Sequence, residues 1–198
     1  RIYLLKVNSL PDSNNQYIIS FTDITQLEWE RKDLELQSIT DSLTQIYNRL
    51  KFDNSLEKEL SRVRRYGVDL SLIMFDIDHF KKINDVYGHQ FGDDVILTMI
   101  SVVKNELRAT DLVGRFGGEE FIVVLTHTSA DAAYEVAERI RHEVNDLSAT
   151  YEGEAVPITI SIGVKSVFNV YPDSDSIIAQ ADYALYQAKD NGRDRVEV

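Results

Sequence analysis

Apolar residues recur along this chain at spacings that alternate between those of helices and those of strands. Between residues 52 and 63 they recur at intervals of three or four residues, which is the pattern of a helix with one buried face. Residues 70–75 form a continuous apolar run of strand length and predict a buried central strand. The same criteria predict further helices around residues 95–103, 133–144 and 177–188, and further strands at residues 112–116, 121–125 and 158–167.

The order of these elements from residue 41 onward indicates the fold class. It runs helix, strand, helix, hairpin, helix, strand, helix, and it favours an α+β fold in which helices pack against a mainly antiparallel sheet. The hairpin is expected at Gly117 and Gly118, because glycine adopts positive φ and lets a ligand approach the backbone closely. A solvated turn would use the same residues, so the glycines alone do not identify a site.

The first 25 residues predict a different unit. Residues 2–7 and 17–21 are β-prone, and residues 8–15 between them are mostly turn formers, so a hairpin with a long loop is expected. Two strands alone are marginally stable in water. We therefore expect the hairpin to belong to a larger sheet. We also expect the sequence, which starts at Arg1 in the middle of a strand pattern, to be a fragment of a longer protein.

Residues 26–40 predict a charged helix without glycine or proline. A weak heptad pattern spans residues 24–34, but it has too few repeats to separate a dimerising coiled coil from a solvated linker helix. Both alternatives remain open.

Composition narrows the chemistry. The 198 residues include 21 Lys and Arg against 33 Asp and Glu, a formal net charge of −12, which argues against nucleic acid or an anionic membrane as the main partner. The absence of cysteine excludes disulfides and thiolate metal sites, and none of the four histidines is paired at a short metal-ligand spacing. Oxygen-ligated hard cations, above all Mg²⁺, remain. No apolar run approaches the roughly 18 residues of a membrane-spanning helix.

Asp76 and Asp78 are the first candidates for chemistry. They follow the predicted central strand, where alternation places both on one face while Ile77 turns to the other. A carboxylate at the end of a buried strand is held rigidly, as a ligand of a hard cation must be. Glu119 and Glu120 follow the glycine pair, and Asp76 and Glu119 could meet at one sheet edge and share Mg²⁺. The alternative is that the two aspartates cap the next segment or pair with the lysines that follow.

Residues 115–121, with the sequence RFGGEEF, resemble the signature of the GGDEF family of diguanylate cyclases in its GGEEF form. Further segments are similar to that family in the family's order: residues 41–49 (DSLTQIYNR), 75–85 (FDIDHFKKIND), 87–93 (YGHQFGD) and 181–194. The resemblance covers residues 41–195, about four-fifths of the chain, and its one visible departure is Ile46 in place of leucine. More weakly, residues 1–25 resemble the last strands of a PAS sensor domain, with its Asp-Ile-Thr ending at residues 23–25.

The resemblance implies both a fold and an activity. The fold is palm-like, as in nucleotidyl cyclases, with a five-stranded sheet flanked by helices, and the activity is condensation of two GTP into cyclic di-GMP with release of pyrophosphate. Each step is attack by a ribose 3′-hydroxyl on an α-phosphate, assisted by two Mg²⁺ ions, for which Mn²⁺ could substitute. Two subunits, each with one GTP, would face each other in a homodimer. The resemblance further implies a cytoplasmic location within a larger bacterial sensor, attached to a membrane only through upstream segments, and no nucleic-acid partner.

Site residues are carried over from the family at matching positions. The metal ligands would be Asp76, the carbonyl of Ile77 and Glu119, and the catalytic side chains would be Glu119, Glu120 and Lys81. GTP would contact Phe80, Asn84, His89, Asp93, Lys189 and Arg193, with the last two on the β- and γ-phosphates. The product would inhibit by binding Arg108, Asp111 and Arg139.

Several of these residues also have a purely structural interpretation. Asp78 could accept a structural hydrogen bond. Lys189 and Arg193, one helical turn apart and therefore on one face, could complement a helix C-terminus capped by Gly192. Arg108 and Asp111 could form a surface ion pair of little energetic value.

The resemblance gives three segments and leaves alternatives to the cyclase. Residues 1–25 would be PAS-like strands, residues 26–40 a signalling helix and residues 41–198 the GGDEF domain. The alternatives are a catalytically silent receptor for GTP or cyclic di-GMP and another Mg²⁺-dependent phosphotransferase with an Asp-x-Asp strand. The intact set of acids and phosphate-binding candidates favours the enzyme. A phosphatase of the Asp-x-Asp-x-Thr type is disfavoured by Phe80 in place of the threonine.

Overall fold

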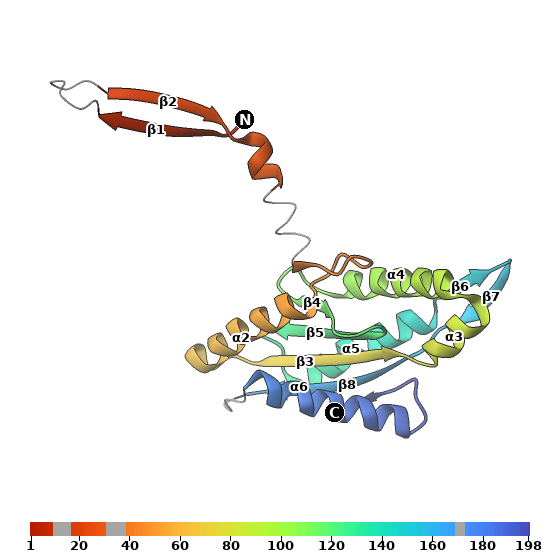
Figure 1. The fold of residues 1–198 in the computed structure, drawn as a ribbon. Helices are drawn as coiled ribbons and strands as arrows, with labels where there is room; N and C mark the ends of the chain where they lie inside the picture. The colour runs from red at the N-terminus through yellow and green to blue at the C-terminus, as the bar shows by residue number, and fades with distance from the viewer. Residues whose placement is uncertain (10–16, 31–38, 169–172) are drawn as a thin grey trace. The chain divides into compact units, whose positions relative to one another are not determined.

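The computed structural model of the chain describes residues 1–9, 17–30, 39–168 and 173–198. These residues form two compact units, Arg1–Ile39 and Thr40–Val198, whose elements are drawn in Figure 1. In the described ranges no helix combines the length and the apolar character needed to cross a membrane.

The first unit is a β-hairpin followed by the start of a helix. Strands β1 (Tyr3–Ser9) and β2 (Tyr17–Asp23) pair antiparallel, and residues 25–30 are helical. Leu4 and Leu5, which point to opposite faces of β1, are 54% and 56% exposed, so the described residues bury neither face. This agrees with a hairpin that belongs to a larger sheet, and its PAS identity stays a prediction. Most of the predicted helix, including the heptad positions 31 and 34, lies outside the described residues.

The second unit is built on a five-stranded sheet with the order β4-β5-β3-β8-β9. The central strand β3 (Leu70–Ile77) pairs antiparallel with β5 (Glu120–Thr126) and with β8 (Ile160–Val167). At the edges, β4 (Leu112–Arg115) pairs antiparallel with β5, and the short β9 (Val196–Glu197) pairs parallel with β8. The α+β class and the mainly antiparallel sheet predicted from the sequence are confirmed.

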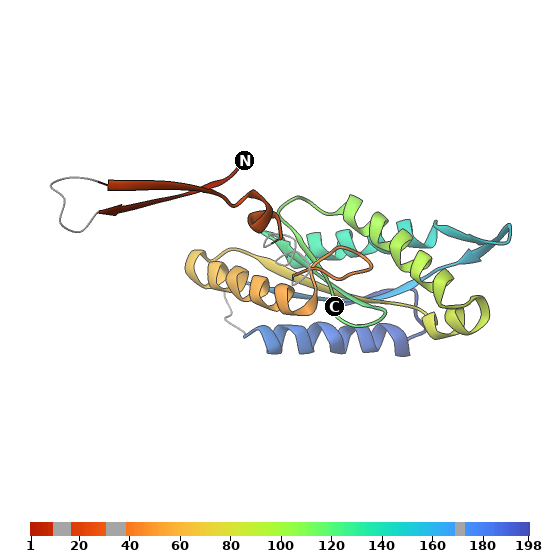
Figure 2. The same cartoon turned by 45° about the horizontal axis from the view of Figure 1, so that its top comes forward.

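Helices cover both faces of this sheet, as Figures 1 and 2 show. One face carries α2 (Arg49–Tyr66) and α6 (Ser174–Asp190). The other carries α3 (Phe80–Tyr87), α4 (His89–Glu106) and α5 (Ala130–Asn145).

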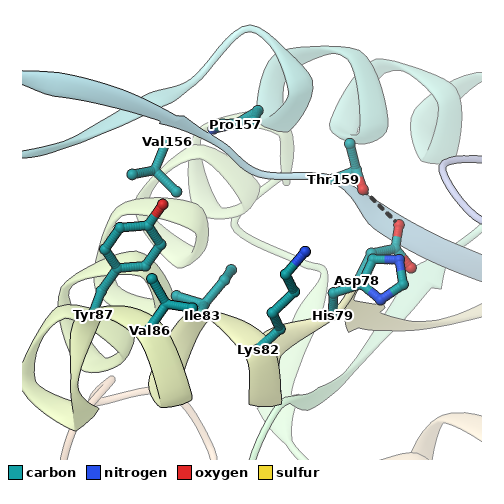
Figure 3. Close-up of a pocket in the computed structure, with 9 residues that line it drawn as sticks. All are labelled: Asp78, His79, Lys82, Ile83, Val86, Tyr87, Val156, Pro157 and Thr159. Carbon is teal, nitrogen blue, oxygen red and sulfur yellow. Dashed lines mark hydrogen bonds between the residues drawn. The ribbon is translucent and has the colours of Figure 1, made fainter.

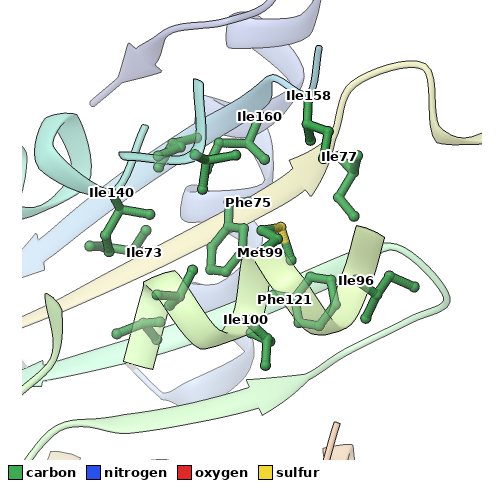
Figure 4. Packing of buried hydrophobic residues seen from close by; sticks show 14 of the residues in the cluster. Ile73, Phe75, Ile77, Ile96, Met99, Ile100, Phe121, Ile140, Ile158 and Ile160 are labelled. Atoms are coloured by element: carbon green, nitrogen blue, oxygen red, sulfur yellow. The ribbon is translucent and has the colours of Figure 1, made fainter. Parts of the chain in front are cut away.

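Apart from Ser71 and Asp76, strand β3 is apolar without alternation, because both of its faces are covered. Its even-numbered side chains, such as Leu72, pack in the cluster with α2 and α6. Its odd-numbered side chains, such as Phe75, pack in the cluster with α4 and α5. Figure 4 shows Phe75 in this second cluster together with Met99 and Phe121, and the two phenylalanine rings stack with centroids 5.4 Å apart.

Four elements of the second unit were not predicted from the pattern of apolar residues: helix α3, the two strands of a second hairpin, and the two-residue edge strand β9. Helix α3 is separated from α4 by Gly88, whose φ of +85° breaks the helix, and it buries few side chains because it is only eight residues long. A second hairpin, β6 (Ser148–Tyr151) and β7 (Glu154–Pro157), turns through left-handed residues Glu152 and Gly153. The predicted strand at 158–167 begins two residues later than expected, at Ile160.

Gly163 provides a test of how β8 and α6 pack. A Cβ at this position would collide with the carbonyl oxygen of Ala181 and the amide nitrogen of Leu185, which are backbone atoms that cannot rotate away. We expect Gly163→Ala to lower the free energy of unfolding by about 3 kcal/mol, the upper end of the usual cost of overpacking. Urea denaturation would measure it. Gly118→Ala is the control, because nothing lies within 4 Å of its Cβ position. Equal denaturation midpoints for both variants would contradict this packing.

Candidate active site

Asp76 lies at the end of the central strand and is buried, with 4% of its surface exposed. In the strand register it stands opposite Glu120 of β5 and Ser161 of β8. Burial raises the pKa of Asp76 to about 6; Lys189, 3.0 Å away, lowers it in part, and the negative charges of Glu119 and Glu120 raise it further. Three carboxylates and one ammonium group therefore interact at the carboxyl end of the central strand.

Asp78 follows β3 and, like Asp76, is buried, but its carboxylate is used by the fold. It accepts hydrogen bonds from Ser161 Oγ (2.7 Å) and from Thr159 Oγ1 (2.8 Å), the second of which is drawn in Figure 3. The backbone N–H of Asp194 donates a third, at 3.1 Å. These bonds tie the end of β3 to β8 and to the segment after α6, so the structural interpretation of Asp78 accounts for its carboxylate.

The glycine pair lies in the loop between β4 and β5, which Arg115 holds in place. Its guanidinium donates to the carbonyl of Gly118 at 2.6 and 3.2 Å and to the carboxylate of Asp41 at 3.1 and 3.3 Å. Burial alone would raise the pKa of Asp41, but hydrogen bonds from Thr44 and the ion pair with Arg115 hold it below its usual value. The loop is thus anchored to the segment before α2.

The expected positive φ at the glycines is wrong: neither Gly117 nor Gly118 is left-handed. The backbone N–H groups of Phe116 and Gly117 donate to the carbonyl of Glu120, at 2.8 and 3.2 Å. A Cβ on Gly117 would lie 2.5 Å from Glu120 Oε2, whereas Gly118 faces open space. The Glu120 carboxylate folds back against the loop, so a side chain at position 117 would displace it from there.

The corner between α3 and α4 collects the candidate base-binding residues. The side-chain oxygen of Asn84 is buried and has no hydrogen-bond partner among the described residues. Gly92 leaves room for it, because a Cβ there would collide with that oxygen and would also lie 3.2 Å from the ring of Phe80. His89 and Asp93 are exposed and four residues apart on α4, so they share a face. An unpaired acceptor and an exposed carboxylate thus lie on neighbouring helices.

The two basic residues near the end of α6 do not share a helix face, contrary to the prediction. The helix ends at Asp190 with Asn191, not Gly192, as its cap. The chain then turns through left-handed residues, with φ +114° at Gly192 and +65° at Arg193, so Arg193 has left the helix. Lys189 is in the last helical turn and reaches Asp76, while Arg193 lies beyond it.

The candidate inhibitory residues gather at the end of α4. Arg139 of α5 forms an ion pair at 3.1 Å with Glu106, the last residue of α4, which lies two residues before Arg108 in the chain. The carboxylate of Asp111 accepts from the backbone N–H of Arg108 (2.9 Å) and of Thr126 (3.2 Å). Within the described residues the guanidinium of Arg108 has no ion pair, so the surface pair between Arg108 and Asp111 is absent from this part of the chain.

Sequence reasoning missed the residues that hold these side chains. Arg115 anchors the glycine loop, Ser161 and Thr159 bind Asp78, and Arg141 of α5 pairs with Asp194 at 2.6 Å. One signal was present: Ser161 is a polar residue between two isoleucines at the start of β8, and it is buried. The others could not be found from the sequence, because each pairs with a group far along the chain or belongs to a loop.

Comparison with known proteins places this geometry in one family. The family model "Diguanylate cyclase, GGDEF domain" matches residues 38–195. The diguanylate cyclase DgcP of Pseudomonas aeruginosa is 41% identical over 167 residues, which are 84% of this chain and 25% of that protein. Diguanylate cyclase A of Treponema denticola is 39% identical over 188 residues, 93% of this chain and 51% of that protein. The chain thus spans about half the length of these relatives, or less.

Solved structures agree in fold and sequence. The coiled coil and GGDEF domain of DgcB from Caulobacter crescentus, in complex with c-di-GMP, superpose with a TM-score of 0.83 at 30% identity, covering 88% of this chain and 93% of that one. The active GGEEF domain of a diguanylate cyclase from Vibrio cholerae superposes with a TM-score of 0.71 at 36% identity. The match covers 76% of this chain and 95% of that one. This chain belongs to the GGDEF-domain family of diguanylate cyclases.

Proposed function

We propose that this chain joins two GTP molecules into cyclic di-GMP and releases pyrophosphate. One observation carries the proposal: the buried carboxylate of Asp76 stands beside Glu119 and Glu120, with Lys189 at 3.0 Å. Like charges gathered at the end of a buried strand are unfavourable, and such perturbed clusters mark functional sites. A cation with a bound triphosphate would relieve this repulsion.

The acidic cluster fits Mg²⁺. In the part of the chain that the structure describes, no three His, Asp or Glu side chains are arranged to hold a metal by themselves. Mg²⁺ is commonly held by one or two carboxylates together with water and substrate phosphates. Asp76, the carbonyl of Ile77 and Glu119 supply oxygen donors of that kind, for two Mg²⁺ ions or for Mn²⁺ in their place. When bound, the metal supplies positive charge for the phosphates and lowers the pKa of the attacking hydroxyl.

The chain's own residues would then accept the proton of the attacking hydroxyl and stabilise the negative charge on the phosphates. Glu119 accepts the proton of the 3′-hydroxyl, the 3′-oxygen forms a bond to the α-phosphorus, and the bond from that phosphorus to the bridging oxygen of pyrophosphate breaks. Lys81, exposed on the first turn of α3, stabilises charge on the phosphates. Glu120, the first residue of β5, lies against Gly117 and adds negative charge beside Asp76.

The corner between α3 and α4 would bind guanine. The unpaired oxygen of Asn84 can accept from a guanine N–H, and the carboxylate of Asp93 can accept from N1–H and the exocyclic amine. The ring of Phe80 lies beside Gly92 at the same corner, and His89 is exposed at the start of α4. A purine without these donors would leave the buried acceptor unpaired, which is the physical basis of base selection.

Lys189 and Arg193 would bind the β- and γ-phosphates. Lys189 reaches Asp76 in this structure, and it would turn to the phosphates once a metal ion compensates that carboxylate. Since each chain offers one guanine site and the product is a ring of two identical halves, catalysis requires two chains facing each other with two-fold symmetry. The segments before the GGDEF domain, residues 41–198, would regulate that encounter. These are residues 1–25, as PAS-like strands, and residues 26–40, as a signalling helix.

Product would inhibit at Arg108, Asp111 and Arg139. The guanidinium of Arg108 has no ion pair within the described residues, and Arg139 is paired with Glu106, two residues before Arg108 in the chain. Two arginines and a carboxylate can bind the phosphates and guanine edges of cyclic di-GMP.

The first test is Glu119→Gln, incubated with GTP and Mg²⁺ while cyclic di-GMP is followed by chromatography. Loss of the proton acceptor and metal ligand should lower the initial rate at least about a hundredfold, the low end for general acid–base catalysis. Thermal unfolding should be unchanged, and Glu57→Gln, exposed on α2, is the control. A variant with more than a tenth of the wild-type rate would contradict the assignment. So would a wild-type chain that makes no product even when dimerised through an N-terminal coiled coil.

Asp76 gives a second test, on stability without Mg²⁺. Its carboxyl ionises near pH 3.8 in the unfolded chain and near 6 in the fold, so ionisation destabilises the native state as pH rises. We expect Asp76→Asn to unfold like wild type at pH 3.5 and to be more stable by about 1–3 kcal/mol above pH 7, while losing activity. Denaturation at both pH values measures this, with Asp85→Asn as control. If the difference in unfolding free energy between Asp76→Asn and wild type does not grow from pH 3.5 to above pH 7, the raised pKa of Asp76 is wrong.

Arg108 tests product inhibition. Arg108→Ala should leave the initial rate unchanged and raise the cyclic di-GMP concentration for half-inhibition at least about tenfold, as expected for loss of a charged hydrogen-bond donor. Asp111 is the poorer choice, because its carboxylate also holds two backbone N–H groups. Lys104→Ala, exposed in the last turn of α4, is the control. Inhibition equal to wild type would exclude Arg108 from the site.

A further inference from the structure

The segment that follows α6 is held in an uncommon conformation. Arg193 and Asp194 both have positive φ, +65° and +44°, which residues other than glycine rarely adopt. Such residues persist where the surrounding structure fixes them, and they cluster at functional sites. In this chain the fixed segment includes Arg193, to which the proposed function assigns a phosphate contact. The backbone N–H of Arg193 donates to the carbonyl of Ala188 at 2.9 Å, and the groups that hold Asp194 fix the residue that follows it.

Arg141 of α5 is the main side-chain partner of Asp194. Its Nη1 lies 2.6 Å from Asp194 Oδ1, and its Nη2 lies 2.9 Å from Glu138 Oε2 on the same helix. Asn145, one turn further along α5, donates to Asp194 Oδ2 at 3.2 Å. The guanidinium side chain is 13% exposed, so water screens this ion pair less than a surface pair. Glu138 fixes the guanidinium in turn and directs it at Asp194.

Asp194 connects this pair to the candidate active site. Its backbone N–H donates to Asp78 Oδ2 at 3.1 Å, and Asp78 directly follows β3, the strand that carries Asp76 and ends at Ile77. The carboxylate of Asp194 is thus held from α5, and its backbone from the end of β3. Both contacts lie one residue from Arg193. Without the guanidinium of Arg141, the Asp194 carboxylate would keep only the hydrogen bond from Asn145, and its uncompensated charge would compete with phosphate for the neighbouring Arg193.

We propose that Arg141 is a positioning residue for triphosphate binding. It neutralises and holds Asp194, which keeps the Arg193 guanidinium free and aimed at the β- and γ-phosphates. This inference rests on the proposed function, and it concerns a residue that the sequence motifs did not single out. Arg141 itself touches neither metal nor nucleotide. Its effect should therefore depend on whether the ligand carries the outer phosphates.

A purely structural role for Arg141 would give a different result. Helix α5 is fixed to the sheet by other side chains, all of them buried: Ala133, Ala137, Ile140 and Val144. Removal of Arg141 should therefore leave the helix in place and change the segment after α6. A general loss of folding would weaken every nucleotide equally, whereas loss of positioning would weaken only those with outer phosphates.

The experiment compares two ligands by calorimetry, with Mg²⁺ present. One is 3′-deoxy-GTP, which lacks the attacking hydroxyl and so is not consumed, and the other is GMP, which lacks the β- and γ-phosphates. For Arg141→Gln we expect about tenfold weaker binding of 3′-deoxy-GTP and GMP binding within about twofold of wild type, the loss of one charged contact. In turnover, KM for GTP should rise while kcat at saturation stays within about threefold.

Matched variants make the result specific. Arg141→Lys keeps the charge without the forked geometry and should fall between wild type and Arg141→Gln. Arg141 and Asp194 should not act additively, so the double variant with Asp194→Asn should lose no more 3′-deoxy-GTP affinity than the weaker-binding single variant. Arg62→Gln is the control, because Arg62 pairs with Glu59 at the same spacing of three residues, 2.7 Å apart, on α2.

The outcomes separate this inference from the proposed function. A folded Arg141→Gln that binds 3′-deoxy-GTP like wild type, or that loses GMP affinity equally, would overturn the positioning role while leaving the cyclase intact. If Arg141→Gln does not fold, Arg141→Lys and Asp194→Asn decide by the same comparison of ligands. A wild-type chain that binds 3′-deoxy-GTP no better than GMP would overturn the phosphate assignment and this inference together.

Discussion

The second unit depends on how the charged residues at the carboxyl end of its central strand, β3, are compensated. A strand covered on both faces can end in charged residues only where neighbours compensate each charge. Asp78 is compensated fully by the protein, through Ser161, Thr159 and the backbone of Asp194. Asp76, two residues earlier on the same face, has Lys189 but also two acidic neighbours. One carboxylate therefore joins the sheet to the segment after α6, and the other keeps uncompensated negative charge beside Glu119 and Glu120.

The same division recurs across the site. The buried side-chain oxygen of Asn84 likewise has no hydrogen-bond partner in the part of the chain that the structure describes. Arg115 is similar in kind to Asp78, because its guanidinium is fully used in holding the glycine loop. Natural proteins accept such local costs in stability where function needs a group that binds a ligand. The site is thus a few uncompensated groups held by a surrounding set of compensated ones.

Much of the fold could be predicted from the sequence, because it follows local periodicity. The helix face predicted between residues 52 and 63 is the buried face of α2, and the apolar run at 70–75 is the central strand. Helix α3 was missed because eight residues carry too little periodicity, and the hairpin at residues 148–157 because its strands have four residues each. The candidate residues at the sheet edge were found because motifs mark them, and the structure brings Asp76 and the two glutamates together.

The sequence by itself determined the α+β class, the family and the segments that hold the candidate site residues, since these depend on spacing within short stretches of chain. Only the tertiary structure decided which of two neighbouring aspartates is saturated, and that Arg193 leaves the helix after Lys189. It also decided that Arg141 reaches Asp194, 53 residues away. The physical reason is that hydrogen bonds and burial depend on which distant segments become neighbours, and local periodicity does not encode those neighbours.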